Sequence, residues 1–216
     1  MKAVQIHRYG APEELKYEDA PDPVIKEDEV LVKVYASGVN PIDWKVRKGY
    51  LKQWLPHSFP LILGWDLSGV VEQVGSNVKN FKKGDEVYGR PDPSRNGTYA
   101  EYIAVRASEL AFKPTTLNHT EAAAVPLAGL TAWQGLMHEG ELKPGQKVLI
   151  NGASGGVGTY AVQFAKWKGA KVIATASKEN FSFLKELGAE EIYDYHIPGY
   201  EKNINDMDIV LDLAGG

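Results

Sequence analysis

Apolar residues in the second half of the chain fall into two alternating patterns. Some form short continuous runs, which are typical of strands buried on both faces of a parallel sheet. Others recur at helical spacing between those runs. We predict strands at 147–151, 171–175, 191–193 and 208–213, with helices at 156–168 and 178–187. Because alternating strands and helices of this length build parallel βαβ units, residues 114–216 are predicted to form a doubly wound α/β domain.

The first half of the chain has a different pattern. Glycines and prolines follow one another at short intervals, and between them lie β-branched runs at 30–35, 68–74 and 99–105. Many short strands separated by turn residues predict a compact, mostly β domain, which we place at residues 1–113. Two short helices are expected after it, at 120–125 and 131–138, and Asn118 or Thr120 would cap the first of them.

Glycines recur at a three-residue spacing in the stretch NGASGGVG, residues 151–158. The stretch follows a predicted strand and opens a predicted helix inside a βαβ unit, which is where a dinucleotide pyrophosphate binds to backbone N–H groups at a helix N-terminus. Gly152 would allow the tight turn, Gly155 and Gly156 a close approach to the phosphates, and Gly158 close packing of the helix. The alternative is a plain connecting turn.

The end of the second predicted strand bears on the choice of cofactor. Enzymes that use NAD place an acidic residue there, on the adenosine ribose. This chain has ATASK at 174–178 instead, so that Ser177 and Lys178 replace a carboxylate and favour the 2′-phosphate of NADP(H). The alternative is that Lys178 is only a solvated residue of a first helical turn, and the neighbouring Glu179 keeps it open.

Composition excludes several other functions. The 216 residues contain no cysteine, so disulfides, thiolate catalysis and cysteine-based zinc sites are excluded, and the five histidines lack ligand spacing. A net charge of −4 without a block of Lys or Arg argues against nucleic acid as a partner. The sequence lacks both an apolar run long enough to span a membrane and a recognisable signal peptide, and we expect a cytoplasmic protein.

Six motifs together resemble the zinc-independent quinone oxidoreductase branch of the medium-chain dehydrogenase/reductase superfamily, and the resemblance covers the whole chain. The motifs are GVNPID at 38–43, LGWDLSGVV at 63–71, GDEVYG at 84–89, GTYAEY at 97–102, PLAGLTA at 126–132 and NGASGGVG at 151–158. The resemblance implies a GroES-like β-barrel-type domain followed by a Rossmann domain, represented here by its first four strands. It also implies NADPH-dependent reduction of a quinone or an α,β-unsaturated carbonyl. An enoyl-thioester reductase and a non-catalytic NADPH-binding or regulatory protein are the alternatives.

The resemblance also suggests roles for individual residues. It places Asn40, Asp43 and Thr131 along the nicotinamide and substrate cleft, where Lys45 replaces a tyrosine of several relatives. The pyrophosphate would contact Ser154, Gly155, Gly156 and Val157, and the 2′-phosphate would lie among Ser177, Lys178 and Tyr195. The structural alternatives are a turn at Asn40, a helix cap at Asp43, a helix start at Thr131 and a surface tyrosine at Tyr195.

Two departures from relatives concern metal and length. The zinc-dependent members place a cysteine where this chain has Asn40 and a histidine where it has Trp65, and neither residue present is a reasonable zinc ligand. We therefore expect no metal. Chains of the family also continue well beyond residue 216, so we expect a truncated form or an incomplete nicotinamide site. The strand at 208–213 would then have an unpaired edge, which predicts self-association as a homo-oligomer, a dimer in the simplest case.

Overall fold

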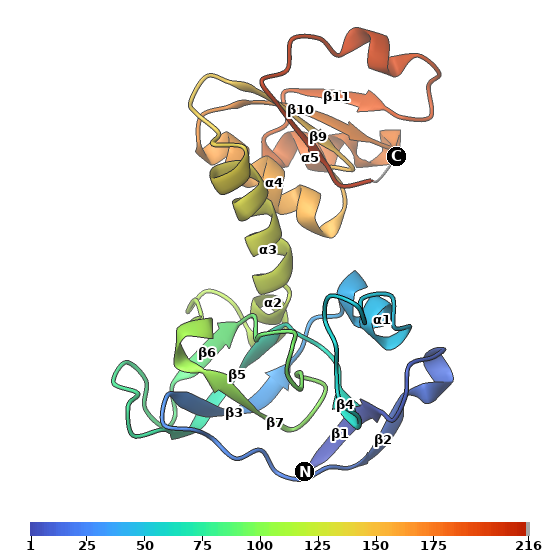
Figure 1. The fold of residues 1–216 in the computed structure, drawn as a ribbon. Coiled ribbons are helices and arrows are strands. Elements are labelled where there is room, and N and C mark those ends of the chain that lie inside the picture. Colours follow the sequence, from blue (N-terminus) through green and yellow to red (C-terminus); the bar gives the residue numbers. More distant parts are fainter. Residues whose placement is uncertain (215–216) are drawn as a thin grey trace. The chain divides into compact units, whose positions relative to one another are not determined.

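The computed structural model describes residues 1–214, which form two compact units, one spanning Met1–Leu127 and the other beginning at Ala128 (Figure 1). The first unit contains two sheets and the second unit one, and each unit has its own apolar core. Two architectures therefore follow one another along the chain, as the change of hydrophobic pattern predicts.

The first unit is built on an antiparallel sheet of five strands in the order β7-β3-β5-β6-β8. Its strands are β3 (Glu29–Ala36), β5 (Leu67–Val74), β6 (Glu86–Gly89), β7 (Tyr102–Arg106) and β8 (Leu110–Phe112). Valines alternate inward along them, and Val30, Val32, Val71, Val87 and Val105 are completely buried. This alternation is what a sheet with one covered face requires.

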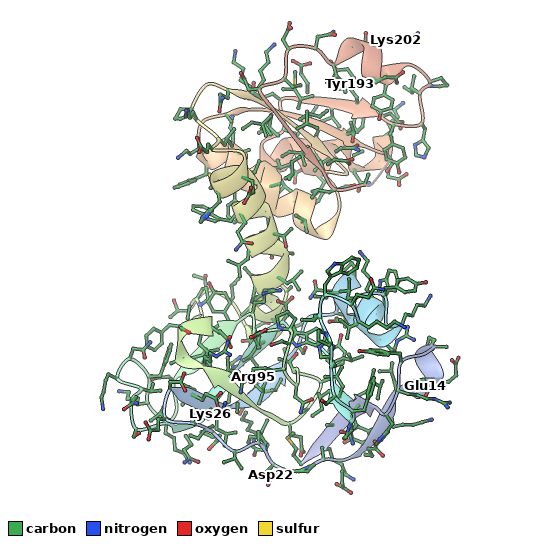
Figure 2. All side chains as sticks on the ribbon, in the orientation of Figure 1. Glu14, Asp22, Lys26, Arg95, Tyr193 and Lys202 are labelled. Carbon is green, nitrogen blue, oxygen red and sulfur yellow. The ribbon has the colours of Figure 1, made fainter. Side chains whose placement is uncertain are left out.

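A buried ion pair joins this sheet to the loop that follows β6. Glu29 begins β3 and is only 2% exposed. Arg95 Nη2 lies 2.6 Å from Glu29 Oε1, and the Lys26 N–H donates to Glu29 Oε2. Arg95 and Lys26 are labelled in Figure 2. The charge is thus paired and hydrogen-bonded, as a buried carboxylate must be.

A second, smaller sheet lies in the same unit. It is antiparallel in the order β2-β1-β4, with β1 (Lys2–Ile6), β2 (Lys16–Asp19) and β4 (Leu61–Ile62). Helix α1 (Pro41–Arg47) packs its Val46 against Ile6, Leu63 and Trp65. A 3-10 turn occupies Pro12–Glu14 and another Ala107–Glu109. The apolar contact fixes α1 beside the residues that follow β4.

Helix α2 (His119–Ala123) belongs to the first unit, although the sequence analysis assigned it to the second domain. Asn118 caps it, with a reciprocal box in which the Glu121 N–H donates to Asn118 Oδ1 and the Asn118 N–H donates to Glu121. Ser68 of β5 and His119 Nδ1 share a hydrogen bond of 2.8 Å. Because this contact ties α2 to the antiparallel sheet, the compact unit extends to Leu127 rather than to residue 113.

The second unit contains a parallel sheet in the order β11-β10-β9-β12. Its strands are β9 (Lys147–Asn151), β10 (Lys171–Ala176), β11 (Glu191–Asp194) and β12 (Ile209–Asp212), and its crossover helices are α4 (Gly156–Trp167) and α5 (Phe181–Leu187). Fully buried residues of β9, β10, α4 and α5 form one core. The strand order is that of the first half of a doubly wound dinucleotide-binding fold, which confirms the predicted fold class.

Two helices differ in detail from the sequence prediction. The helix expected at 131–138 begins earlier, as α3 (Pro126–Trp133), and continues as a π-helical segment at Gln134–Glu139. Pro126 can start a helix because the first helical N–H has no intrahelical partner. The helix expected at 178–187 divides into a 3-10 turn, Lys178–Asn180, and α5, which ends at Gly188 in the left-handed region. A further 3-10 turn lies at Tyr200–Asn203.

Candidate cofactor and active site

The glycine-rich turn between β9 and α4 is fixed by a buried threonine of the neighbouring strand. Gly152 has φ +76, and its N–H donates to Thr175 Oγ1 at 3.1 Å. The same hydroxyl donates to Asn151 Oδ1 at 2.5 Å, and the Ala153 N–H donates to the Thr175 carbonyl. Thr175 is 1% exposed, so a rigid anchor on β10 sets the path of the turn. Glycine suits position 152 because other residues rarely adopt this conformation.

The glycines that follow differ in their surroundings: a Cβ at Gly155 would lie 3.3 Å from the Gly152 carbonyl oxygen, whereas Gly158 is packed and Gly156 is open. A Cβ at Gly158 would collide with the carbonyl oxygens of Gly152 and Ala153, so helix α4 can sit this close to the turn only without a side chain there. Gly155 and Gly156 are exposed, and a Cβ at Gly156 would meet nothing within 4 Å. Open backbone at the start of α4 is what an approaching anion needs.

The first turn of α4 therefore has the properties of a phosphate-binding site. Gly155 is its N-cap residue and makes no side-chain cap, and α4 extends from Gly156 over 12 residues. Ser154 and Val157, the other predicted pyrophosphate contacts, lie partly exposed in the turn and in the first helical turn. All the residues predicted to contact the pyrophosphate thus lie together at one helix N-terminus, and their role stays a prediction.

The residues predicted to surround the 2′-phosphate lie at the carboxyl ends of two adjacent strands. Ala176 of β10 is in register with Asp194 of β11, so Ser177 and Lys178 follow one strand where Tyr195 follows the other. Lys178 is exposed and Tyr195 is 50% exposed. The sheet brings these three residues to one edge.

Acidic groups share that edge. Ser177 Oγ donates to Glu179 Oε1 at 2.9 Å and accepts from Asn180 Nδ2 at 2.9 Å. Asp194 accepts from the backbone N–H of His196 at 2.9 Å, and this bond is the main reason that the pKa of the Asp194 carboxyl lies below its usual value. A 2′-phosphate at this edge would meet the ammonium of Lys178 but also the carboxylate of Glu179.

A network of polar side chains surrounds Asn40 in the first unit. Asn40 is the N-cap residue of α1, and its backbone N–H donates to Asp43 Oδ2 at 2.7 Å. The Tyr99 hydroxyl donates to the same oxygen at 2.7 Å. Burial raises the pKa of the Asp43 carboxyl, and burial together with Asp43 raises the pKa of the Tyr99 phenol. Asp43 is therefore a helix cap, as the structural alternative held, and it also lies beside Asn40.

Asp66 completes the network, although no role was predicted for it from the sequence. It is 1% exposed, its Oδ2 accepts from Asn40 Nδ2 at 2.7 Å, and its Oδ1 accepts from the Leu127 N–H at 2.7 Å. Burial, the largest effect, raises the pKa of its carboxyl to about 6. The available signal was a single carboxylate inside the apolar run LGWDLSGVV at 63–71, where an unpaired charge would be costly.

Family models match both units of the chain. The alcohol dehydrogenase GroES-like domain matches residues 26–115, and the family described as zinc-binding dehydrogenase matches 156–216. The structure of the quinone oxidoreductase from Coxiella burnetii is 43% identical, with a TM-score of 0.89 over 100% of this chain and 69% of that one. The chain is a quinone oxidoreductase-like member of the medium-chain dehydrogenase/reductase superfamily.

Two curated relatives show what other members of the superfamily do. The mitochondrial NAD(P)H oxidoreductase RTN4IP1 of Mus musculus is 40% identical over 237 residues, which cover 100% of this chain and 60% of the relative. The 2-methylene-furan-3-one reductase of Solanum lycopersicum is 41% identical over 100% of this chain and 57% of its own length. The chain thus spans about 60% of the length of the curated relatives.

Trp65 and Thr131, two further residues discussed from the sequence, belong to different units. Trp65 is completely buried, and its Nε1–H donates to the Arg95 carbonyl at 3.2 Å. Thr131 lies inside α3 and in the second unit, so it does not begin a helix.

Two kinds of feature are absent from the described residues. Among residues 1–214, no three His, Asp or Glu side chains form a group suited to a metal ion. No described helix is long and apolar enough to cross a membrane.

Proposed function

We propose that the protein is an oxidoreductase that binds NADPH and reduces a quinone or an α,β-unsaturated carbonyl without zinc. The observation that carries this proposal is the glycine turn, which Thr175 holds in place and which leaves backbone open at the N-terminus of α4. Relatives named as quinone oxidoreductase and as enone reductase support the substrate class. The test is oxidation of NADPH, followed by its absorbance, in the presence of 1,4-benzoquinone.

The preference for NADPH over NADH rests on the edge formed by β10 and β11. Ser177 and Lys178 stand where an NAD enzyme has a carboxylate, and Lys178 is exposed and available to a phosphate. We expect calorimetry to give a lower Kd for NADPH than for NADH, and Lys178→Glu to reduce this preference. Equal affinities in the unsubstituted protein would contradict the assignment.

Bound NADPH would supply the hydride, and the protein would supply orientation and an environment for the substrate carbonyl. Asn40 offers an amide N–H, which is a hydrogen-bond donor suited to that oxygen. Tyr99 keeps its proton, because the pKa of its phenol is raised, and its hydroxyl donates a hydrogen bond to Asp43. Asn40, Asp43 and Tyr99 therefore orient one another, and none of them is assigned as a general acid.

Zinc independence is supported by the two residues that stand at the ligand positions of zinc-dependent members. The Trp65 indole nitrogen can only donate a hydrogen bond, and it donates to the Arg95 carbonyl oxygen. The Asn40 amide nitrogen donates to Asp66, so neither nitrogen is suited to bind zinc. We expect activity to survive exhaustive treatment with EDTA. Stoichiometric zinc in elemental analysis of the treated protein would contradict this expectation.

Two other functions remain to be separated by experiment. An enoyl-thioester reductase of the same superfamily would oxidise NADPH faster with an enoyl thioester than with benzoquinone. A non-catalytic NADPH-binding protein would bind the cofactor in calorimetry and would oxidise it with neither substrate.

We also propose that the protein forms a homo-oligomer, and sedimentation velocity is the test. The cytoplasmic location stays a prediction.

A further inference from the structure

Asp66 is a carboxylate that is almost completely buried between apolar residues. It lies just before β5, between the fully buried Trp65 and Leu67, and each of its oxygens accepts one hydrogen bond. Its charge is not paired within an ion bridge: Asn40 and Leu127 both offer neutral N–H donors. A charge kept in such a place, at a cost in stability, is a candidate for a functional role.

The absence of a side chain at Gly38 leaves room for the Asp66 carboxylate. A Cβ at Gly38 would lie 2.7 Å from Asp66 Oδ2 and 2.8 Å from the Ala123 carbonyl oxygen. The strand end that leads into Asn40 thus passes directly over the carboxylate. This contact and the bond to Asn40 fix the N-terminal side of α1 against Asp66.

An ionised carboxylate can only accept hydrogen bonds, and this decides the orientation of the Asn40 side chain. The amide must turn its nitrogen toward Asp66, because its oxygen there would repel the carboxylate. The backbone of Asn40 is already held by Asp43. One amide N–H is used by Asp66 and the amide oxygen faces the Asp43 N–H in the capping box of α1, so the second amide N–H remains for another partner.

We propose that Asp66 is a positioning residue, which orients the amide of Asn40 so that its second N–H can donate to the carbonyl oxygen of the substrate. This inference rests on the proposed function, because quinones and enones offer oxygen atoms that only accept hydrogen bonds. Asp66 acts through Asn40 and does not itself touch the substrate.

Protonation of Asp66 would remove its constraint on the orientation of the Asn40 amide. The charged or titratable groups that influence Asp66 are Asp43 on α1, which raises the pKa of its carboxyl, Arg90 after β6, which lowers it, and Tyr99, whose own pKa Asp66 raises. With its pKa at about 6, Asp66 takes up a proton in mildly acidic solution and can then donate to the Asn40 amide oxygen. The amide is then free to turn over.

The variant Asp66→Asn reverses the pattern without a change of shape. Its oxygen can still accept from the Leu127 N–H, and its nitrogen then meets Asn40, which must present its oxygen instead. The matched control is Glu29→Gln, which also removes the charge of a buried carboxylate but lies in the Arg95 pair. Both proteins are compared with the unsubstituted chain by NMR of the Asn side-chain amides and by NADPH oxidation with 1,4-benzoquinone.

We expect the Asn40 side-chain amide signals to shift with a midpoint near pH 6 in the unsubstituted chain and in Glu29→Gln, and to lose this transition in Asp66→Asn. The turnover number should fall about 10- to 100-fold in Asp66→Asn, with the Kd for NADPH unchanged. Asn40 signals that do not respond to pH or to the substitution would overturn the proposal, and so would full turnover in Asp66→Asn. If the unsubstituted chain oxidises no NADPH, the proposed function fails, and the amide signals alone decide whether Asp66 orients Asn40.

Discussion

A buried carboxyl with a raised pKa makes the stability of the first unit depend on pH. The pKa of Asp66 rises from 3.8, the value of a solvated carboxyl, to about 6 in the folded protein. The folded state therefore binds the proton more tightly than the unfolded state. Stability contributed by this site is fully present below about pH 4 and is lost as the pH rises through about 6.

The corresponding prediction uses Asp66→Asn, which cannot ionise. Relative to the unsubstituted protein, the variant should gain stability between about pH 4 and about pH 7, by at most about 3 kcal/mol for a shift of this size. Urea unfolding at both pH values measures the difference. A free-energy difference between the two proteins that is the same at both pH values would show that Asp66 has an ordinary pKa.

Glu179 gives a second prediction at the scale of one residue. Its carboxylate accepts from Ser177 Oγ, at the edge where a 2′-phosphate would bind. Glu179→Gln keeps an acceptor and removes the repulsion, so NADPH should bind about fivefold more tightly while NADH binding stays the same. Calorimetry with both cofactors tests this, with Glu186→Gln on α5 as an exposed control. Equal gains for the two cofactors would place the 2′-phosphate elsewhere.

The sequence allowed prediction of some of these residues, but for Asp66 it showed only a carboxylate inside an apolar run and not the partners of that carboxylate. The glycine turn was predictable because tight turns and close backbone contacts constrain residues that are neighbours in sequence. Asp66 depends on partners that are 26 and 61 positions away, and a single sequence contains no record of such contacts. Asn40 and Asp43 came from the family resemblance and not from a local pattern.

At the scale of the element, two glycines at the start of helix α4 differ in role, since one is needed for packing and the other for binding. Gly158 faces the backbone of Gly152 and Ala153, whereas Gly156 faces open space. Gly158→Ala should lower the free energy of unfolding by about 1–3 kcal/mol, because the added methyl group overpacks this contact.

The matched change is Gly156→Ala, in the same helical turn. It should leave stability within about 0.5 kcal/mol of the unsubstituted protein but weaken NADPH binding, because the methyl group would stand where the phosphates approach. Thermal unfolding and calorimetry measure the two effects. Equal losses of stability in the two variants would mean that the two glycines do not differ in packing.

Helix α2 shows why an element's type is easier to predict than its place. The helix and its cap at Asn118 follow from residues close together in sequence. Its assignment to the first unit depends on the bond between Ser68 and His119, which lie 51 positions apart. Hydrophobic spacing predicts that a helix has a buried face, but it does not say which sheet covers that face.

At the scale of the whole molecule, the proposed self-association predicts that sedimentation velocity shows a species larger than one chain of 23.7 kDa. A single monomeric species at every protein concentration would contradict it.

The burial of Trp65 gives the molecule a built-in optical probe. Trp44, Trp54 and Trp167 are 40%, 78% and 71% exposed, whereas Trp65 is completely enclosed next to Asp66. Iodide in solution quenches only indoles that it can reach, so the light that survives quenching comes mainly from Trp65 and from the half-buried Trp133. Once Trp133 is replaced by phenylalanine, a red shift of that residual emission would report water entering around Trp65 and Asp66, and it would do so without any label or added dye.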